Sequence, residues 1–84
     1  MEYRLRIDLE VLEVLDGLAK ADRRRLLAQF HKIRSFPGNY ADYYQHDAVG
    51  RRAQISIVAG WAIHYWEDFA DRQVKILTLG PADK

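Results

Sequence analysis

The chain has 84 residues, a formal net charge of +1 and no cysteine, and 49% of its residues are hydrophobic against 30% that are charged. These values are typical of one soluble domain, residues 1–84, and they exclude disulfide bonds and thiolate zinc sites. No apolar run reaches the roughly 20 residues that cross a bilayer and no signal peptide is recognisable, so we expect a cytoplasmic protein without a membrane partner.

The first half of the chain predicts one strand and two helices. Residues Tyr3 to Ile7 alternate between apolar and cationic side chains, as in a half-buried strand. Apolar residues then recur at helical spacing after Asp8, a suitable N-cap, and again from about Asp22 to Ser35, where Pro37-Gly38-Asn39 ends the second helix. The short connection predicts an antiparallel helical hairpin that packs on a sheet. Its apolar stripes are Val11, Leu12, Val14, Leu15 and Leu18, and then Leu26, Leu27, Phe30 and Ile33.

The second half predicts three or four antiparallel strands. They are residues 40–47 at a sheet edge, Ile55 to Val58, Trp61 to Trp66, and Val74 to Leu79. Gly50, the pair Ala59-Gly60 and the polar run Glu67 to Arg72 supply the turns between them. The predicted fold class is therefore α+β, with an N-terminal strand, a two-helix hairpin and an antiparallel three- to four-stranded meander, the helices packing on one face of the sheet.

Alternation of side chains along a strand gives this sheet an inner and an outer face. On the inner face, toward the helices, we expect Ile55, Ile57, Ile63 and Tyr65. On the outer face we expect Gln54, Ser56, Ala62, His64 and Trp66. Functional side chains are therefore expected on the outer face.

Six segments carry a family resemblance through their order and spacing. They are Tyr3 to Ile7, Leu18 to Lys20, the basic stretch Arg23 to Leu27, Ser35 to Pro37, Gly60 to Tyr65, and Val74 to Leu79. Together they resemble the RelE/ParE superfamily of toxins from bacterial type II toxin–antitoxin modules, over the length of the chain. This resemblance implies the RelE/ParE-like fold and a cognate antitoxin as protein partner.

The resemblance also implies one of two targets. RelE-like members cleave messenger RNA in the ribosomal A site, whereas ParE-like members poison DNA gyrase. Cleavage needs a base near the attacking 2′-hydroxyl, cations around the phosphate and an acid for the leaving oxygen. The resemblance implies cations where this chain has Gln54, Ser56 and Ala62. Three hypotheses follow: a ribosome-dependent mRNA endonuclease with a degenerate site, a gyrase inhibitor, and an inert module that binds a partner protein.

His64 is the candidate catalytic base, because an imidazole exchanges a proton near neutral pH. Arg51 and Arg52 are candidate phosphate clamps in the catalytic site. Since neighbouring residues in a strand point to opposite faces, we expect one of these two arginines beside His64.

Four further residues are candidates for binding the substrate. Trp66 offers a surface on which an unpaired base can stack, and His46 lies on the uncertain edge strand. Arg23 and Arg24 belong to the basic second helix. The two histidines lack a third ligand at suitable spacing and no cofactor motif is present, so we expect neither a metal nor a cofactor.

Overall fold

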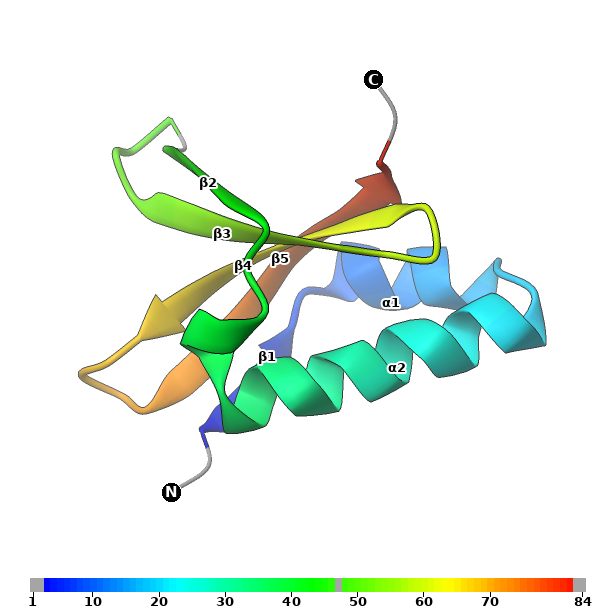
Figure 1. The fold of residues 1–84 in the computed structure, drawn as a ribbon, viewed down its shortest axis with the longest axis horizontal. Coiled ribbons are helices and arrows are strands. Elements are labelled where there is room, and N and C mark those ends of the chain that lie inside the picture. The colour runs from blue at the N-terminus through cyan, green and yellow to red at the C-terminus, as the bar shows by residue number, and fades with distance from the viewer. Residues whose placement is uncertain (1–2, 47, 83–84) are drawn as a thin grey trace.

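The computed structural model describes residues 3–46 and 48–82 (Figure 1). Its elements are β1 (Arg4–Ile7), α1 (Leu9–Asp16), α2 (Lys20–Ser35), the 3-10 turn η1 (Pro37–Asn39), β2 (Tyr43–His46), β3 (Arg52–Val58), β4 (Trp61–Asp68) and β5 (Gln73–Pro81). Asp47, which the sequence assigned to the edge strand, lies outside the described residues. Within the described ranges, no helix is both long and apolar enough to cross a bilayer.

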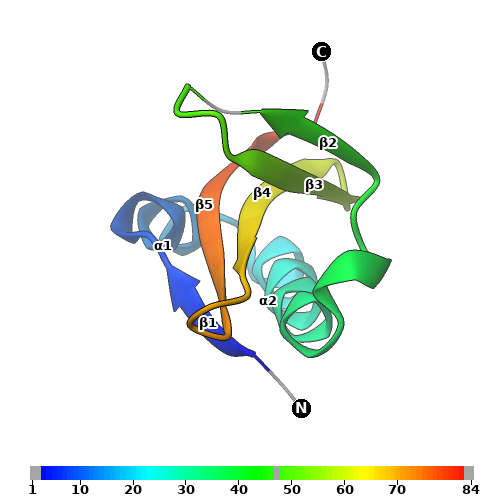
Figure 2. The same ribbon diagram turned by 90° about the vertical axis from the view of Figure 1, so that its left-hand side faces the viewer.

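The five strands form one sheet in the order β1-β5-β4-β3-β2. β2 to β5 are a continuous antiparallel meander, whereas β1 pairs in parallel with the first half of β5. The sheet is strongly twisted, as Figure 2 shows: β2 and β3 run across the top of that view while β4 and β5 run down it. The predicted α+β class and the meander are confirmed, and the edge strand is present as a shorter β2.

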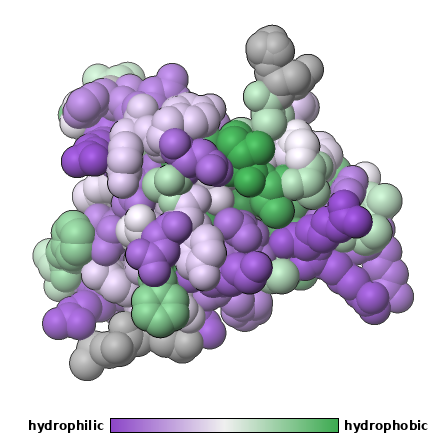
Figure 3. Space-filling view, in the orientation of Figure 1, coloured by the Kyte–Doolittle hydropathy of each residue, from purple (hydrophilic) through white to green (hydrophobic). Residues whose placement is uncertain are grey.

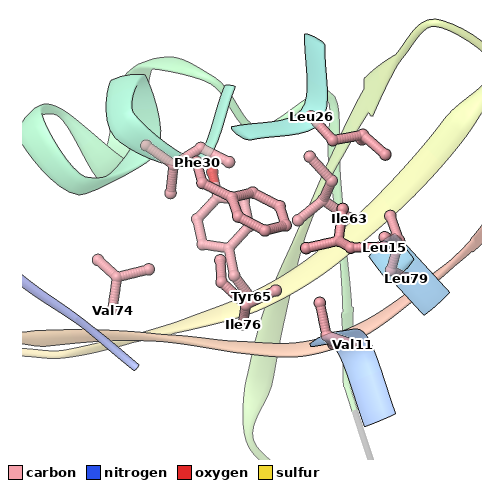
Figure 4. Close-up of a cluster of buried hydrophobic side chains, with 10 residues drawn as sticks. Val11, Leu15, Leu26, Phe30, Ile63, Tyr65, Val74, Ile76 and Leu79 are labelled. Carbon is pink, nitrogen blue, oxygen red and sulfur yellow. The ribbon is translucent and has the colours of Figure 1, made fainter. Parts of the chain in front are cut away.

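The two helices run in opposite directions and share one core with the sheet (Figure 1). The core combines Val11 and Leu15 of α1, Leu26, Phe30 and Ile33 of α2, and Ile63, Tyr65, Val74, Ile76 and Leu79 of the sheet (Figure 4). We call the sheet face in this core the inner face and the opposite one the outer face. Tyr65 is buried among these apolar groups, and its hydroxyl donates a 2.8 Å hydrogen bond to the Pro37 carbonyl oxygen.

Several boundaries differ from those that the sequence predicted. α2 begins at Lys20, two residues before Asp22, and Asp8 has N-cap backbone angles but makes no side-chain capping bond. β4 continues to Asp68 because the polar residues Glu67 and Asp68 pair with Val74 and Gln73 of β5. The sequence interpretation assigned Glu67 and Asp68 to the second turn because they are polar, and this assignment was wrong. Leu12 and Leu27 are exposed, contrary to prediction, since each adjoins the buried stripe of its helix without joining it.

The register of β3 reverses the faces that the sequence predicted for this strand. Antiparallel partners point to the same side of a sheet, and Ile55 pairs with His64 while Ser56 pairs with Ile63. Ile55 and Ile57 therefore lie on the outer face, and Gln54 and Ser56 lie on the inner face. A 2.9 Å hydrogen bond from Gln29 Nε2 of α2 to Ser56 Oγ confirms the correction. The prediction assigned both isoleucines to the inner face by their hydrophobicity. Ile55 is buried as expected, at 0% exposure, but on the outer side of the sheet, whereas Ile57 is 37% exposed.

Candidate functional site

The outer face is built from three strands whose side chains alternate in register. β4 contributes Ala62, His64 and Trp66, and their partners on β5 are Gly80, Thr78 and Lys75. β3 contributes Ala53, Ile55 and Ile57. The face therefore has small or apolar residues at its centre, one histidine among them, and an aromatic and cationic end.

His64 borders a cavity of about 220 Å³ on this face. The cavity is lined by Gln45, His46, Ala53, His64, Leu77 and Thr78. The Nδ1 atom of His64 is buried and has no hydrogen-bond partner among the described residues. Burial disfavours the charged imidazolium and lowers the pKa of His64 below its ordinary value. The ring is therefore neutral near pH 7 and can accept a proton.

Two cations lie over the ring of Trp66 at one end of the outer face. The Arg51 guanidinium carbon is 5.2 Å from the centroid of the Trp66 ring, and Lys75 Nζ is 4.9 Å from it. Lys75 Nζ also lies 3.6 Å from Asp68 Oδ2. Cations over an indole ring are held by its quadrupole, so this cluster places two positive charges next to an aromatic platform.

The centre of the outer face lacks the cations that the family resemblance implies. Once the register of β3 is known, the residues beside Ala62 and His64 are Ile57 and Ile55, and neither carries charge. Gln54 and Ser56 were wrongly placed there by the sequence. The cations next to this face lie at its Trp66 end, where Arg51 and Lys75 are found.

The structure brings together some of the predicted site residues and separates others. Arg51 reaches Trp66 on the outer face, whereas Arg52 alternates with Gln54 to the inner side and stacks 3.9 Å from the Tyr44 ring centroid. One arginine of the pair is thus on the side of His64, as the sequence predicted.

His46 shares the 220 Å³ cavity with His64 because β2 pairs with β3. Arg23 and Arg24 lie on α2, against the inner face, and are not part of this site. Arg23 instead donates a 3.5 Å hydrogen bond to the Leu18 carbonyl oxygen. Among the described residues, no three His, Asp or Glu side chains gather as a metal site would require.

Lys75 and Thr78 lie beside the candidate residues Trp66 and His64 on the outer face, and the sequence interpretation missed both. Alternation along the last strand carried the signal for Lys75, since Val74 and Ile76 on either side of it are buried in the core. The signal for Thr78 was hidden, because a register shift between His64 and Tyr65 changes the phase of β5 relative to β4.

Comparison with known proteins places this geometry in a known fold. No protein-family model matches the sequence, and no curated protein matches it. Solved structures do match. The RelE chain of an archaeal RelE–RelB complex from Pyrococcus horikoshii superposes with a TM-score of 0.84 and 25% sequence identity, over 100% of this chain and 99% of that one.

Two more distant structures share the same architecture. A chain of the RelBE2 toxin–antitoxin complex from Mycobacterium tuberculosis matches with a TM-score of 0.79 and 13% identity, covering 96% of this chain and 99% of that one. A mutant of the E. coli RelE toxin with two arginines replaced by alanine, solved in the free state, matches with a TM-score of 0.75 and 17% identity, covering 99% of this chain and 86% of that one. The chain has the RelE fold over its whole described length.

Proposed function

We propose, from the premise that this chain is a member of the RelE superfamily of toxins, that it is the toxin subunit of a toxin–antitoxin module. The match to an archaeal RelE chain over nearly the full length of both proteins supports this assignment. The solved structures include complexes of RelE with RelB, which supports a cognate antitoxin as the partner of this chain.

The reaction that the outer face supports best is cleavage of messenger RNA at the ribosome. The observation that carries this proposal is the neutral, half-buried His64 at a cavity on the same face as the Arg51, Trp66 and Lys75 cluster. His64 takes the proton of a 2′-hydroxyl, whose oxygen attacks the adjacent phosphorus. The cations stabilise the charge that develops on the phosphate oxygens.

The leaving 5′-oxygen must receive a proton as the phosphorus–oxygen bond breaks. His46 also borders the cavity, but it is the antiparallel partner of Arg52 and so belongs to the inner side of the sheet. Solvent that reaches the open face therefore supplies this proton. The products are then a 2′,3′-cyclic phosphate and a free 5′-hydroxyl, and His64 carries the proton of the 2′-hydroxyl. Transfer of that proton to solvent restores the neutral imidazole.

A protein target such as DNA gyrase is the second candidate. Ile57 is 37% exposed on the outer face, and an exposed isoleucine suits contact with a protein surface better than contact with a phosphate backbone. Figure 3, viewed from the side on which α2 lies in front, shows a further hydrophobic area next to β3 and β4, above the hydrophilic side chains along α2. If DNA gyrase is the target, the protein inhibits supercoiling and cleaves no RNA.

Induced expression in bacteria without an antitoxin tests the assignment. We expect growth to stop and amino-acid incorporation to fall within one generation, and a His64→Gln variant to restore both. His31→Gln is the matched control, because His31 is exposed on α2, away from this face. Growth equal to that of an empty vector would contradict a toxin. Arrest with intact translation and inhibited supercoiling would favour the gyrase target.

A further inference from the structure

A second and larger cavity opens on the inner side of the sheet. It has a volume of about 380 Å³ and is lined by Gly38, Tyr44, Arg52, Gln54, Trp66, Glu67 and Phe69. In Figure 1 this region is at the left, where α2, η1 and the turn between β4 and β5 come together. The cavity is therefore separate from the one beside His64.

The floor of this cavity contains a buried amide with an unused acceptor. Gln54 is 8% exposed, and its Nε2 donates a 3.3 Å hydrogen bond to Glu67 Oε1. Its Oε1 is buried and has no partner among the described residues. Because this oxygen is buried, the group that a ligand meets at this wall is the Glu67 carboxylate, which the Gln54 Nε2 group holds in place.

Glu67 offers further acceptor positions to such a ligand. A carboxylate has about four lone-pair positions. Gln54 uses one, and the Tyr3 hydroxyl uses another, since a hydrogen bond to Glu67 is the main cause of the raised pKa of Tyr3. The remaining positions suit a ligand edge with two adjacent N–H groups.

Arg52 and Phe69 provide the complementary features. The Arg52 guanidinium carbon lies 3.9 Å from the Tyr44 ring centroid and lines the cavity, and a guanidinium stacked on a ring keeps its in-plane N–H groups available to an acceptor. Phe69 lines the cavity yet is 70% exposed, so one large aromatic face is available for stacking. Trp66 is less suitable because Arg51 and Lys75 lie over its ring.

We propose that this cavity binds a guanine base of single-stranded RNA. The N1–H and N2–H groups of guanine donate to Glu67, its O6 or N7 accepts from Arg52, and its ring stacks on Phe69. Adenine presents an acceptor where guanine presents N1–H, and this acceptor would face the carboxylate. A cationic side chain of a partner protein fits less well, because Arg52 repels it. The proposal rests on the proposed function for RNA as the ligand, but not on cleavage.

Nucleotide titration of the full chain tests this proposal without ribosomes. Guanosine 5′-monophosphate and adenosine 5′-monophosphate carry the same phosphate and sugar, so the difference between them isolates the base. Followed by amide NMR, guanosine monophosphate should shift the amides of Gly38, Glu67 and Phe69 and bind at least tenfold more tightly than adenosine monophosphate. Phe69→Ala and Glu67→Gln should each weaken it about tenfold.

Phe36→Ala is the matched control, since Phe36 is 60% exposed and lies outside the lining of the cavity. It should leave the affinity unchanged. Equal binding of both nucleotides, shifts centred on His64, or an arginine peptide that binds in place of guanosine monophosphate would overturn the proposal. If the Glu67→Gln variant does not fold, the affinity of the Phe69→Ala variant for guanosine monophosphate decides the test. Failure of RNA cleavage would contradict the proposed function and leave this binding result standing.

Discussion

Ile55 is the direct antiparallel partner of His64, so an apolar side chain lies beside the proposed catalytic base. Burial by such neighbours lowers the pKa of the imidazole and keeps it neutral. Because apolar residues occupy these positions, the centre of the face has none of the cations that RNA cleavage uses. The outer face therefore combines a well-placed proton acceptor with phosphate contacts restricted to the Arg51 and Lys75 end.

The assignment of faces in β3 predicts opposite outcomes for adjacent substitutions to lysine. Ser56 is 1% exposed and bonded to α2, so Ser56→Lys buries an unpaired charge and should abolish cooperative folding. Ile57 is 37% exposed on the outer face, and Ile57→Lys should keep the fold. Thermal unfolding followed by circular dichroism compares the two variants. A folded Ser56→Lys protein beside an unfolded Ile57→Lys protein would mean that the register is shifted by one residue.

The buried hydroxyl of Tyr65 should contribute measurably to stability. In Tyr65→Phe the Pro37 carbonyl loses its 2.8 Å hydrogen bond, and we expect the free energy of unfolding to fall by about 1–3 kcal/mol. Tyr43→Phe is the matched control because Tyr43 is exposed on β2. Urea denaturation gives both values. Equal stability of the Tyr65→Phe and Tyr43→Phe variants would show that η1 is not anchored through this hydroxyl.

The lowered pKa of His64 makes stability depend on pH in a defined direction. Above about pH 7 the imidazole is neutral in both the folded and the unfolded chain. Below about pH 6.5 the unfolded chain binds a proton that folded His64 resists, so the free energy of unfolding decreases until the pH reaches the lower pKa of the folded state.

His64→Gln removes this contribution. The stability of the parent chain minus that of the variant should therefore be larger at pH 7.5 than at pH 5, as measured by urea denaturation at each pH. A difference that grows as the pH falls would mean that the folded protein stabilises the charged imidazolium instead.

Lys75 should contribute one phosphate contact to RNA binding. For single strands each contact adds about 0.7 to the slope of log affinity against log salt concentration. Lys75→Met should reduce the magnitude of this slope by about that amount for a short single-stranded RNA, measured by fluorescence anisotropy. Lys32→Met, which removes an exposed cation from α2, is the control and should change the slope less. Equal slopes in both variants would place the backbone contacts elsewhere.

Much of the fold could be predicted because its signals are local. The alternation in β1, the apolar spacing in α1 and α2 and the turn at Gly60 each depend on residues close in sequence. The parallel pairing of β1 with β5 and the phase of β3 depend on partners far away in sequence. Ile55 and Ile57 then suggested the wrong face, because a strand with apolar residues on both sides gives no preferred phase.

The candidate site was predicted only in part, because some of its contacts are local in sequence and others depend on strand pairing. His64 and Trp66 share a strand, so alternation placed them together, and the choice between Arg51 and Arg52 needed the β3 register. The cavity lined by Gln54, Glu67 and Phe69 could not be foreseen, because it depends on how η1, the strands β2 to β4 and the turn after β4 meet in space.

His64 on the outer face serves, in the mechanism that we propose, as the base in RNA cleavage. The most direct test adds purified protein to programmed ribosomes and maps the ends of the messenger RNA by primer extension. We predict cleavage by the parent chain and by His31→Gln, and a rate at least about 100-fold lower for His64→Gln. Undiminished cleavage by the His64→Gln variant, or no cleavage by the parent chain, would contradict the account.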